Sequence, residues 1–291
     1  MRGLMISRQF GYLSAGAALA LALAGCETVS RVSPSQQVAV VEEATGATSA
    51  NIASLTEVVQ RNPNDPSAYN TRGAAYAKSG RYSDAVNDFN RAVQIDPNYA
   101  PAYTNRGLAF RQTNRNDAAY ADFSKAIASD PNYGPAYVGR ANLLRVQGNY
   151  PEALNDLSQA IRLAPESAEG LHARGLVHQR MGRHKEAVSD FDAAIDRNPF
   201  VAAPYAARGQ SLVVLGQYDK AVEDFNAALN VDNRNAEGWA QRGIALEKLN
   251  RRPEALESYQ RALAVDPNNA TGKQGVARLG GGGGGIAGLF R

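Results

Sequence analysis

The sequence predicts an all-α solenoid built from stacked helix pairs, and three observations predict it. A 34-residue pattern recurs six times without an insertion across residues 66–269 of the 291-residue chain. Within each unit, apolar and small residues recur at spacings of three and four, which is the period of one helix face. A Gly or Asn divides every unit, and a Pro or Asn closes it. Because one helix pair cannot bury its apolar face alone, such units stack on their neighbours.

The N-terminal residues 1–25 have the pattern of a signal peptide. Arg2 and Arg8 precede an apolar run over residues 11–24, which is shorter than the ~20 residues that a spanning helix needs. The chain's one cysteine, Cys26, follows at once, so no internal disulfide can form. The leader holds no acidic residue, so its removal lowers the net charge from +3 to +1. This near-neutral balance gives no electrostatic footprint for nucleic acid, which we do not expect as a partner.

The segment Leu23-Ala24-Gly25-Cys26 resembles the lipobox of bacterial lipoproteins. The resemblance implies that Cys26 becomes the mature N-terminus and carries a diacylglyceryl group and an amide-linked acyl chain. Two or more acyl chains anchor a protein stably to a membrane that it does not span. Glu27 stands where an Asp often retains lipoproteins in the inner membrane, which favours the outer membrane, facing the periplasm. The alternative is an ordinary signal peptide followed by a free thiol.

The segments that flank the repeats are expected to be a tether and two caps. Residues 26–50 are rich in Ser, Thr, Ala, Val and Gln without helical spacing, which predicts a disordered tether. Residues 51–65 predict an N-terminal capping helix, because their apolar residues share one face and end in phase with the repeats. Residues 270–279 predict a polar C-terminal capping helix, with Lys273 at the place of the repeated aromatic residue. The glycine-rich tail, residues 280–291, ends regular structure, and its apolar end either frays or docks on a partner or on the protein's own groove.

The six units span residues 66–99, 100–133, 134–167, 168–201, 202–235 and 236–269. We number the places of a unit from its first residue. The first helix has a large residue at the fourth place: Tyr69, Tyr103, Tyr137, Leu171, Tyr205 and Trp239. A small residue at the eighth place lets the partner helix approach closely: Gly73, Gly107, Ala141, Gly175, Gly209 and Gly243.

The second half of each unit predicts a turn, a second helix and a stop. The turn residue tolerates the left-handed conformation: Gly80, Asn114, Gly148, Gly182, Gly216 and Asn250. The second helix places a large core residue at the twenty-fourth place: Phe89, Phe123, Leu157, Phe191, Phe225 and Tyr259. The thirty-second place stops the helix: Pro97, Pro131, Pro165, Pro199, Asn233 and Pro267.

The period and these positions resemble the tetratricopeptide repeat. The resemblance covers residues 66–269 and implies a right-handed superhelix of helix-turn-helix repeats. It also implies a concave groove, lined by the first helices, that binds proteins or peptides. The groove places are the second, fifth, ninth, twelfth and thirteenth. The candidate groove residues are Asn70, Lys78, Thr104, Leu108, Arg111, Gln112, Val138, Asn142, Arg145, His172, Leu176, Gln179, Arg180, Gln210, Val213, Ile244 and Lys248.

The candidate groove has a basic line, Lys78, Arg111, Arg145 and Arg180, interleaved with apolar residues. This combination suits an extended or helical peptide that carries acidic groups. The alternative for each of these residues is ordinary solvated surface.

A second charged pattern consists of Arg at the seventh place of all six units and Asp at the twenty-third place of five, with Ser258 in the sixth. It predicts either a charged binding ladder or a structural ion pair that repeats with the unit. Repeating units copy structural contacts more readily than ligand contacts, which favours the structural pair. Exposed pairs of this kind contribute only ~0–1 kcal/mol each.

We find no chemistry that predicts an enzyme, a metal or a cofactor. The three histidines, His172, His178 and His184, all fall in repeat four, but their spacing does not place them on one helix face. No Cys or carboxylate accompanies them at the spacing of a metal site. Nucleophile motifs, phosphate loops and paired catalytic carboxylates are not apparent.

These observations together predict a membrane-anchored interaction scaffold of the bacterial cell envelope. Other envelope proteins or peptides are the expected partners, and lipidated Cys26 is the expected membrane contact. A pilotin-like assembly factor and an adaptor for envelope proteases or hydrolases both fit this plan. The alternative is a module that binds cell-wall material or polysaccharide in support of export or envelope integrity. Oligomeric state is left open by the sequence.

Overall fold

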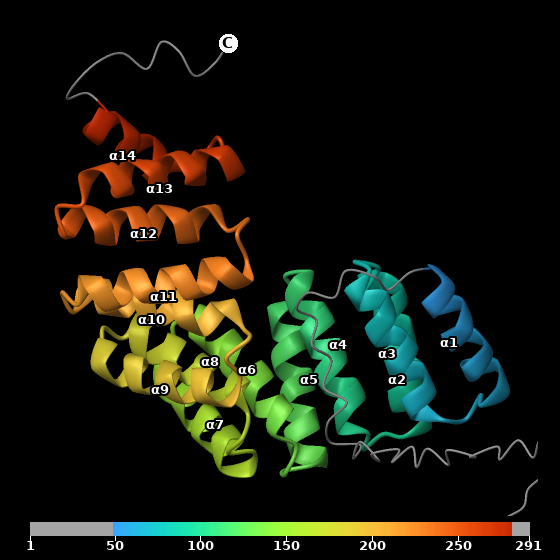
Figure 1. Cartoon of the computed structure of the whole chain (residues 1–291). Coiled ribbons are helices and arrows are strands. Elements are labelled where there is room, and N and C mark those ends of the chain that lie inside the picture. Colours follow the sequence, from blue (N-terminus) through green and yellow to red (C-terminus); the bar gives the residue numbers. More distant parts are fainter. Residues whose placement is uncertain (1–48, 281–291) are drawn as a thin grey trace, which may run out of the picture. The chain divides into compact units, whose positions relative to one another are not determined.

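A computed structural model describes residues 49–280, which form fourteen helices and contain no strand (Figure 1). The expected signal peptide, Cys26, the expected tether up to residue 48 and the tail from residue 281 lie outside the described residues. The helices are α1 (Ser49–Arg61), α2 (Pro66–Lys78), α3 (Tyr82–Ile95), α4 (Ala100–Gln112), α5 (Asn116–Ser129), α6 (Gly134–Val146), α7 (Tyr150–Leu163), α8 (Ala168–Arg180), α9 (His184–Arg197), α10 (Ala202–Val214), α11 (Tyr218–Val231), α12 (Ala236–Lys248), α13 (Arg252–Val265) and α14 (Ala270–Gly280). The predicted all-α solenoid of helix pairs is confirmed.

Five of the six units start their first helix with a local signal, either a capping side chain or a proline at the first or second residue; α10 of unit five follows Val201 and has no side-chain cap. Asp65 precedes α2, and its carboxylate accepts a hydrogen bond from the backbone N–H of Ser67 at 2.8 Å. Proline lies in the first turn of α2, α4 and α6, where its missing N–H removes no helical hydrogen bond. Units four and six use a side chain before the helix instead: Ser167 before α8 and Asn235 before α12. These signals favour a helix start at the same place of five units.

The turn inside each unit requires a left-handed backbone. Gly80 has φ +77° and Asn114 has φ +58°, and the four equivalent residues in the other units are also positive. A Cβ added at Gly80 would meet nothing within 4 Å, so the backbone angle rather than space selects glycine. The turn then closes with a hydrogen bond from the backbone N–H of Arg81 to the Tyr76 carbonyl at 2.9 Å, in the manner of a Schellman motif.

In five of the six units, an aromatic ring of the second helix packs against a glycine of the first. Phe89 is fully buried, and a Cβ on Gly73 would lie 2.6 Å from its Cε1 atom. Repeat three differs at both places, with Leu157 in the second helix and Ala141 in the first. The smaller leucine leaves room for the alanine methyl group, so the two places vary together for a steric reason.

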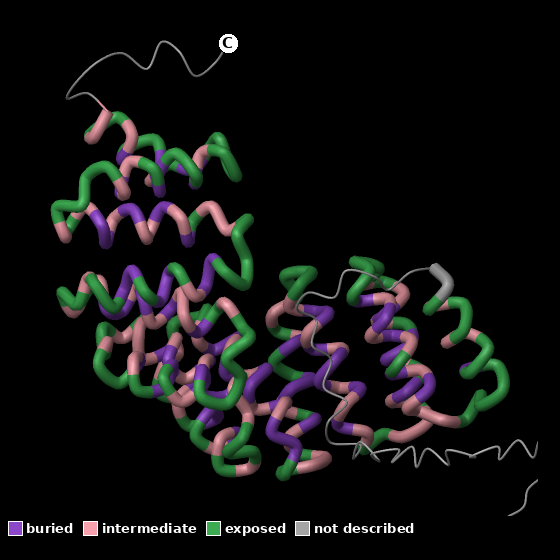
Figure 2. Tube along the Cα trace, viewed as in Figure 1, coloured by how far each residue is buried: buried purple, intermediate pink, exposed green. Residues whose placement is uncertain are grey.

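Successive helices pack in chain order, and buried residues run along their facing sides (Figure 2). Each first helix also contacts the first helix of the next unit, as α2 does α4 and α6 does α8. Between residues 49 and 280, neighbouring second helices such as α3 and α5 make no comparable contact. The first helices are therefore closer together and form the concave side of the repeats.

A helix packs at each end of the six units. α1 packs on α2, with Val59 buried, and starts at Ser49, so the last two residues of the expected tether are helical. α14 packs on α12 and α13, where Gly275 lies against the ring of Tyr259. None of the helices between residues 49 and 280 is long and apolar enough to cross a membrane.

Candidate functional site

The seventeen candidate groove residues differ in their accessibility. Four are exposed: Lys78, Gln112, Arg180 and Lys248. Ten are half-buried: Leu108, Arg111, Asn142, Arg145, His172, Leu176, Gln179, Gln210, Val213 and Ile244. Three are buried: Asn70, Thr104 and Val138.

The prediction is wrong for Asn70, Thr104 and Val138, which are only 2%, 1% and 5% exposed and cannot meet a partner. All three occupy the fifth place, which faces the first helix of the next unit in this part of the chain. Asn70 Oδ1 accepts a hydrogen bond from Asn105 Nδ2 of α4 at 2.8 Å, and Val138 joins a core cluster with Val177 of α8. The fifth place here holds the units together instead of lining the groove.

Three arginines of the predicted basic line interact electrostatically across neighbouring first helices. The pKa of Arg145 is lowered, first by burial and then by the positive charges of Arg180 and Arg111. In the described part of the chain, none of the three has a carboxylate within 4 Å, and Arg145 Nε is buried without a hydrogen-bond partner. Lys78 is two first helices away from Arg145 and is not part of this cluster. We call Arg111, Arg145 and Arg180 the arginine cluster.

His172 lies beside the arginine cluster and is neutral at physiological pH. Burial first, and the charge of Arg145 second, lower its pKa to about 4. Its ring lies 5.7 Å from that of Phe191, centre to centre. His172 therefore adds a neutral polar surface next to the cationic one.

Polar groups farther along α8 are used to join neighbouring units. Gln179 Nε2 donates to the backbone carbonyl of Ala207 and to Ser211 Oγ of α10, both at 3.1 Å. This amide is consequently less available to a ligand than its half-buried position suggests.

Two exposed apolar residues at the thirteenth place complete the site. Val146 is 70% exposed at the end of α6, and Val214 is 63% exposed at the end of α10. Neither valine is among the candidate groove residues, although the same place carries Lys78, Arg180 and Lys248 in other units. An apolar residue at a place that is polar or charged in the other units is the sequence signal that identifies them.

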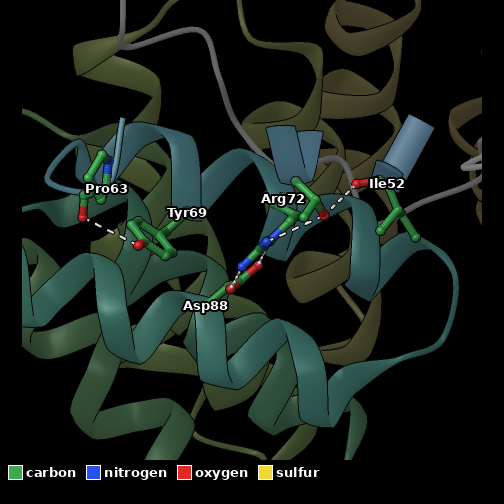
Figure 3. A network of polar contacts seen from close by, with 6 residues as sticks. Ile52, Pro63, Tyr69, Arg72 and Asp88 are labelled. Carbon is green, nitrogen blue, oxygen red and sulfur yellow. Dashed lines mark hydrogen bonds and ion pairs between the residues drawn. The ribbon is translucent and has the colours of Figure 1, made fainter. Parts of the chain in front are cut away.

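The arginine and aspartate ladder is structural. Arg72 donates from Nε and Nη2 to the two carboxylate oxygens of Asp88, both at 2.7 Å, and its Nη1 reaches Thr56 of α1 (Figure 3). Units two to five repeat the paired contact: Arg106 with Asp122, Arg140 with Asp156, Arg174 with Asp190 and Arg208 with Asp224. The aspartate side chains are only 5–9% exposed. The structural interpretation is confirmed, but these pairs are far less solvated than the exposed pairs expected from the sequence.

His178, one of the three histidines, lies beside an aspartate of the ladder. His178 Nε2 lies 3.7 Å from Asp190, a carboxylate that Arg174 already holds, and burial lowers the pKa of His178. The described residues contain no group of three or more His, Cys, Asp or Glu side chains able to hold a metal ion.

Comparison with known families agrees with this helical-repeat geometry. A family model of the TPR repeat matches residues 73–113 and 141–182, and three tetratricopeptide repeat models match residues 100–133, 172–236 and 236–269. The fold and its concave surface define a repeat solenoid of the kind that binds other proteins. The chain belongs to the tetratricopeptide repeat family. A comparison with curated proteins found no match.

Solved structures share the fold at low sequence identity. A chain of the APC/C hetero-tetramer Cut9–Hcn1 matches with a TM-score of 0.71 and 20% identity over 78% of this chain, which spans only 45% of that one. PilW, a widely conserved type IV pilus biogenesis factor, matches with a TM-score of 0.66 and 15% identity, over 72% of this chain and 97% of PilW. YrrB, a TPR protein with an unusual peptide-binding site, matches with a TM-score of 0.52 and 24% identity, over 64% of this chain and 96% of YrrB.

Proposed function

We propose that this interaction scaffold is an adaptor of the bacterial cell envelope that holds acidic peptide segments of other envelope proteins. The observation that carries the proposal is the arginine cluster, in which three neighbouring first helices present cations without carboxylate partners. Lipidated Cys26 is its membrane anchor, and the outer membrane, facing the periplasm, is its location.

An acidic partner suits the arginine cluster for an electrostatic reason. Arg145 is half-buried, so its charge has lost part of its hydration, and two like charges lie nearby. A carboxylate from a partner would offset both effects and would form charge-assisted hydrogen bonds, which are among the stronger polar contacts in proteins. Opposite charge also guides a partner to the surface and raises the rate of association.

Apolar side chains beside the cluster supply the contact area that charges alone do not. Val146 lies next to Arg145 in sequence, and Leu176 lies one turn before Arg180 on α8. A peptide with acidic groups set among apolar residues would bury these side chains while its carboxylates meet the arginines. This pairing distinguishes the groove from an ordinary charged surface.

The anchor and the location rest on the sequence. Cys26 ends the apolar leader, and Glu27 follows it. The likeness of fold to PilW supports an assembly or adaptor role in the envelope, because that protein is a pilus biogenesis factor. YrrB supports peptide binding by a repeat array of this kind.

The proposal is tested by crosslinking in living cells, followed by purification of the anchored protein and identification of what it carries. The variant reverses the arginine cluster: Arg111→Glu, Arg145→Glu and Arg180→Glu. The matched control makes the same change in net charge on exposed second-helix residues: Lys125→Glu, Lys185→Glu and Lys220→Glu.

We expect one or a few envelope proteins to be captured by the wild type and the control, and lost by the cluster variant. Capture that survives the reversal would show that the groove residues are wrong although the adaptor role stands. Enrichment of cell-wall fragments without any protein would favour the glycan-binding alternative and contradict the proposal.

A further inference from the structure

Repeats five and six depart from the repeat pattern at three places that hardly vary in the other units. Asn233 replaces the closing proline, Trp239 replaces the usual tyrosine, and Ser258 replaces the ladder aspartate. The backbone at this junction keeps its normal form, since Asp232 Oδ1 accepts from the N–H of Arg234 at 3.0 Å as the equivalent aspartates do in other units. The differences therefore lie in side chains and not in the path of the chain.

Among the residues that the structure describes, Arg242 is the one ladder arginine without an aspartate partner. Its Nη1 donates to Ser258 Oγ and its Nε to Asn226 Oδ1, both at 2.6 Å. Its pKa is lowered, first by burial, whereas a hydrogen bond to aspartate is the first cause of the raised pKa of the five other ladder arginines. The ladder thus ends in a partly buried cation that lacks the carboxylate its counterparts bind.

The nearest acidic residues do not fill this gap. Glu254 and Glu257 both act on Arg242 from a distance. Glu254 is paired with Arg251 at 2.5 Å, and Glu257 with Arg261 at 2.9 Å. Arg242 has no carboxylate within 4 Å among residues 49–280.

Arg242 lines a hollow of about 520 Å³ together with Trp239 and residues of α11. Asn226, Asn230 and Asn233 give it exposed carboxamides, and Leu229 gives it an apolar surface. Asn226 and Asn230 are one turn apart, or about 6 Å along the helix axis. Asn226 Oδ1 already accepts from Arg242, so Asn226 offers only its N–H donors. The carboxamides of Asn230 and Asn233 can donate and accept hydrogen bonds, as the N–H and C=O groups of an extended peptide also do.

The hollow is separate from the groove. Helical residues advance by about 100° each, which sets the fourth and seventh places of a first helix on the face opposite its groove places. Trp239 and Arg242 occupy those two places in α12, and the other lining residues belong to α11 and the loop after it. A ligand here would leave the arginine cluster free.

We propose that this hollow is a second binding site, for the carboxylate of an acidic peptide segment, which accepts from Nη2 of Arg242 while Nε and Nη1 keep their hydrogen bonds to Asn226 and Ser258. Nδ2 of Asn226 and the carboxamides of Asn230 and Asn233 bind the peptide backbone on either side of the acidic residue. A peptide fits better than a sugar, because the guanidinium carbons of Arg261 and Arg242 already lie 5.1 and 5.8 Å from the centre of the Trp239 ring. These cations occupy ring surface on which a sugar would stack.

Trp239 is the only tryptophan in the chain, so its fluorescence reports on the hollow directly. The probe is a synthetic heptapeptide of Gly and Ser with one central Glu, acetylated and amidated at its ends, and its Gln counterpart is the control. Titrated into the full chain, the Glu peptide is expected to change the emission in a saturable way, and the Gln peptide to bind at least tenfold more weakly.

Two variants of one residue provide the sharper test. Ser258→Asp supplies Arg242 with the internal carboxylate present in the other five units, so the Glu peptide should bind at least tenfold more weakly. In Ser258→Asn, the new side chain is nearly as large as aspartate but uncharged. This variant should therefore bind the Glu peptide with an affinity within twofold of the wild type. Thermal unfolding followed by circular dichroism verifies that both variants are folded.

Four results would overturn the proposal. These are equal binding of the Glu and Gln peptides, undiminished binding by Ser258→Asp, the absence of any saturable response, and a response to an oligogalacturonate but not to the peptide. Reversal of the arginine cluster must leave the Trp239 response unchanged. Loss of the response in that variant would place the peptide in the groove and refute the second site, independently of the adaptor role.

Discussion

Replacing Asp122 by Asn is expected to destabilise repeat two strongly, because the change leaves a partly buried guanidinium without its counter-charge. Arg106 donates to both oxygens of Asp122 at 2.7 Å, and the side chains are only 16% and 9% exposed. Removing one partner of a buried pair costs about 3–5 kcal/mol, while an exposed pair contributes about 0–1 kcal/mol. The pair at the edge of the helix interface lies between these limits, so we expect a loss of about 2–3 kcal/mol.

The measurement combines urea unfolding with hydrogen exchange, because repeat arrays can open one part at a time and a single global value would mislead. Exchange should rise in α4 and α5 and much less in distant units. The control is Asp84→Asn, which removes the same charge from an exposed pair with Arg81, where the side chains are 43% and 52% exposed. That control should lose less than about 1 kcal/mol. If the two variants are equally stable, the ladder is ordinary solvated surface and the reasoning is wrong.

Three further predictions follow from the fold, the groove and the leader. Gly175→Ala should destabilise repeat four by about 1–2 kcal/mol, since the new Cβ would lie 2.5 Å from Phe191 Cε1 and the clash exceeds the gain in helix propensity. Adding Phe191→Leu, which reproduces the alanine and leucine of repeat three, should recover part of that loss in thermal unfolding. His172, with its pKa lowered to about 4, should make the protein more stable above pH 6.5 than at pH 4, because the unfolded chain binds a proton in that range and the folded chain does not. Its contribution is at most about 3 kcal/mol, and His172→Gln should flatten the unfolding free energy between pH 6.5 and 4; an unchanged slope would refute the assignment. Cys26→Ser should abolish incorporation of labelled palmitate and release the protein from the membrane fraction, whereas labelling that persists would contradict lipidation at this residue.

The fold could be predicted from the sequence because the residues that each structural feature requires recur at the same places in six repeats. The left-handed turn at Gly80 and Asn114 and the close approach at Gly73 are local requirements that only a few residue types satisfy. Each is visible as a constant place in the pattern. Agreement between local signals and period was therefore sufficient for the architecture.

Accessibility at the groove could not be predicted in the same way, because it depends on how closely neighbouring units pack. Asn70 and Thr104 occupy a place expected to face a partner, yet the adjacent first helix covers them. The burial of the ladder has the same origin, since an arginine such as Arg106 also reaches Asn90 of the preceding unit, at 2.7 Å. Contacts between units depend on how one unit packs against the next in the superhelix. The residue pattern of a single unit does not reveal which side chains this packing buries.

The central claim, that the groove holds acidic segments of envelope proteins, is tested most directly by a photo-crosslinking residue placed at Val146 in the anchored protein. The same residue at Lys185, on a second helix, is the control. After irradiation of living cells, mass spectrometry identifies the attached peptide. We expect an acidic segment of an envelope protein to be joined at position 146 only, and to be lost when Arg111, Arg145 and Arg180 are reversed to Glu. No adduct at position 146, or the same adduct at both positions, would contradict it.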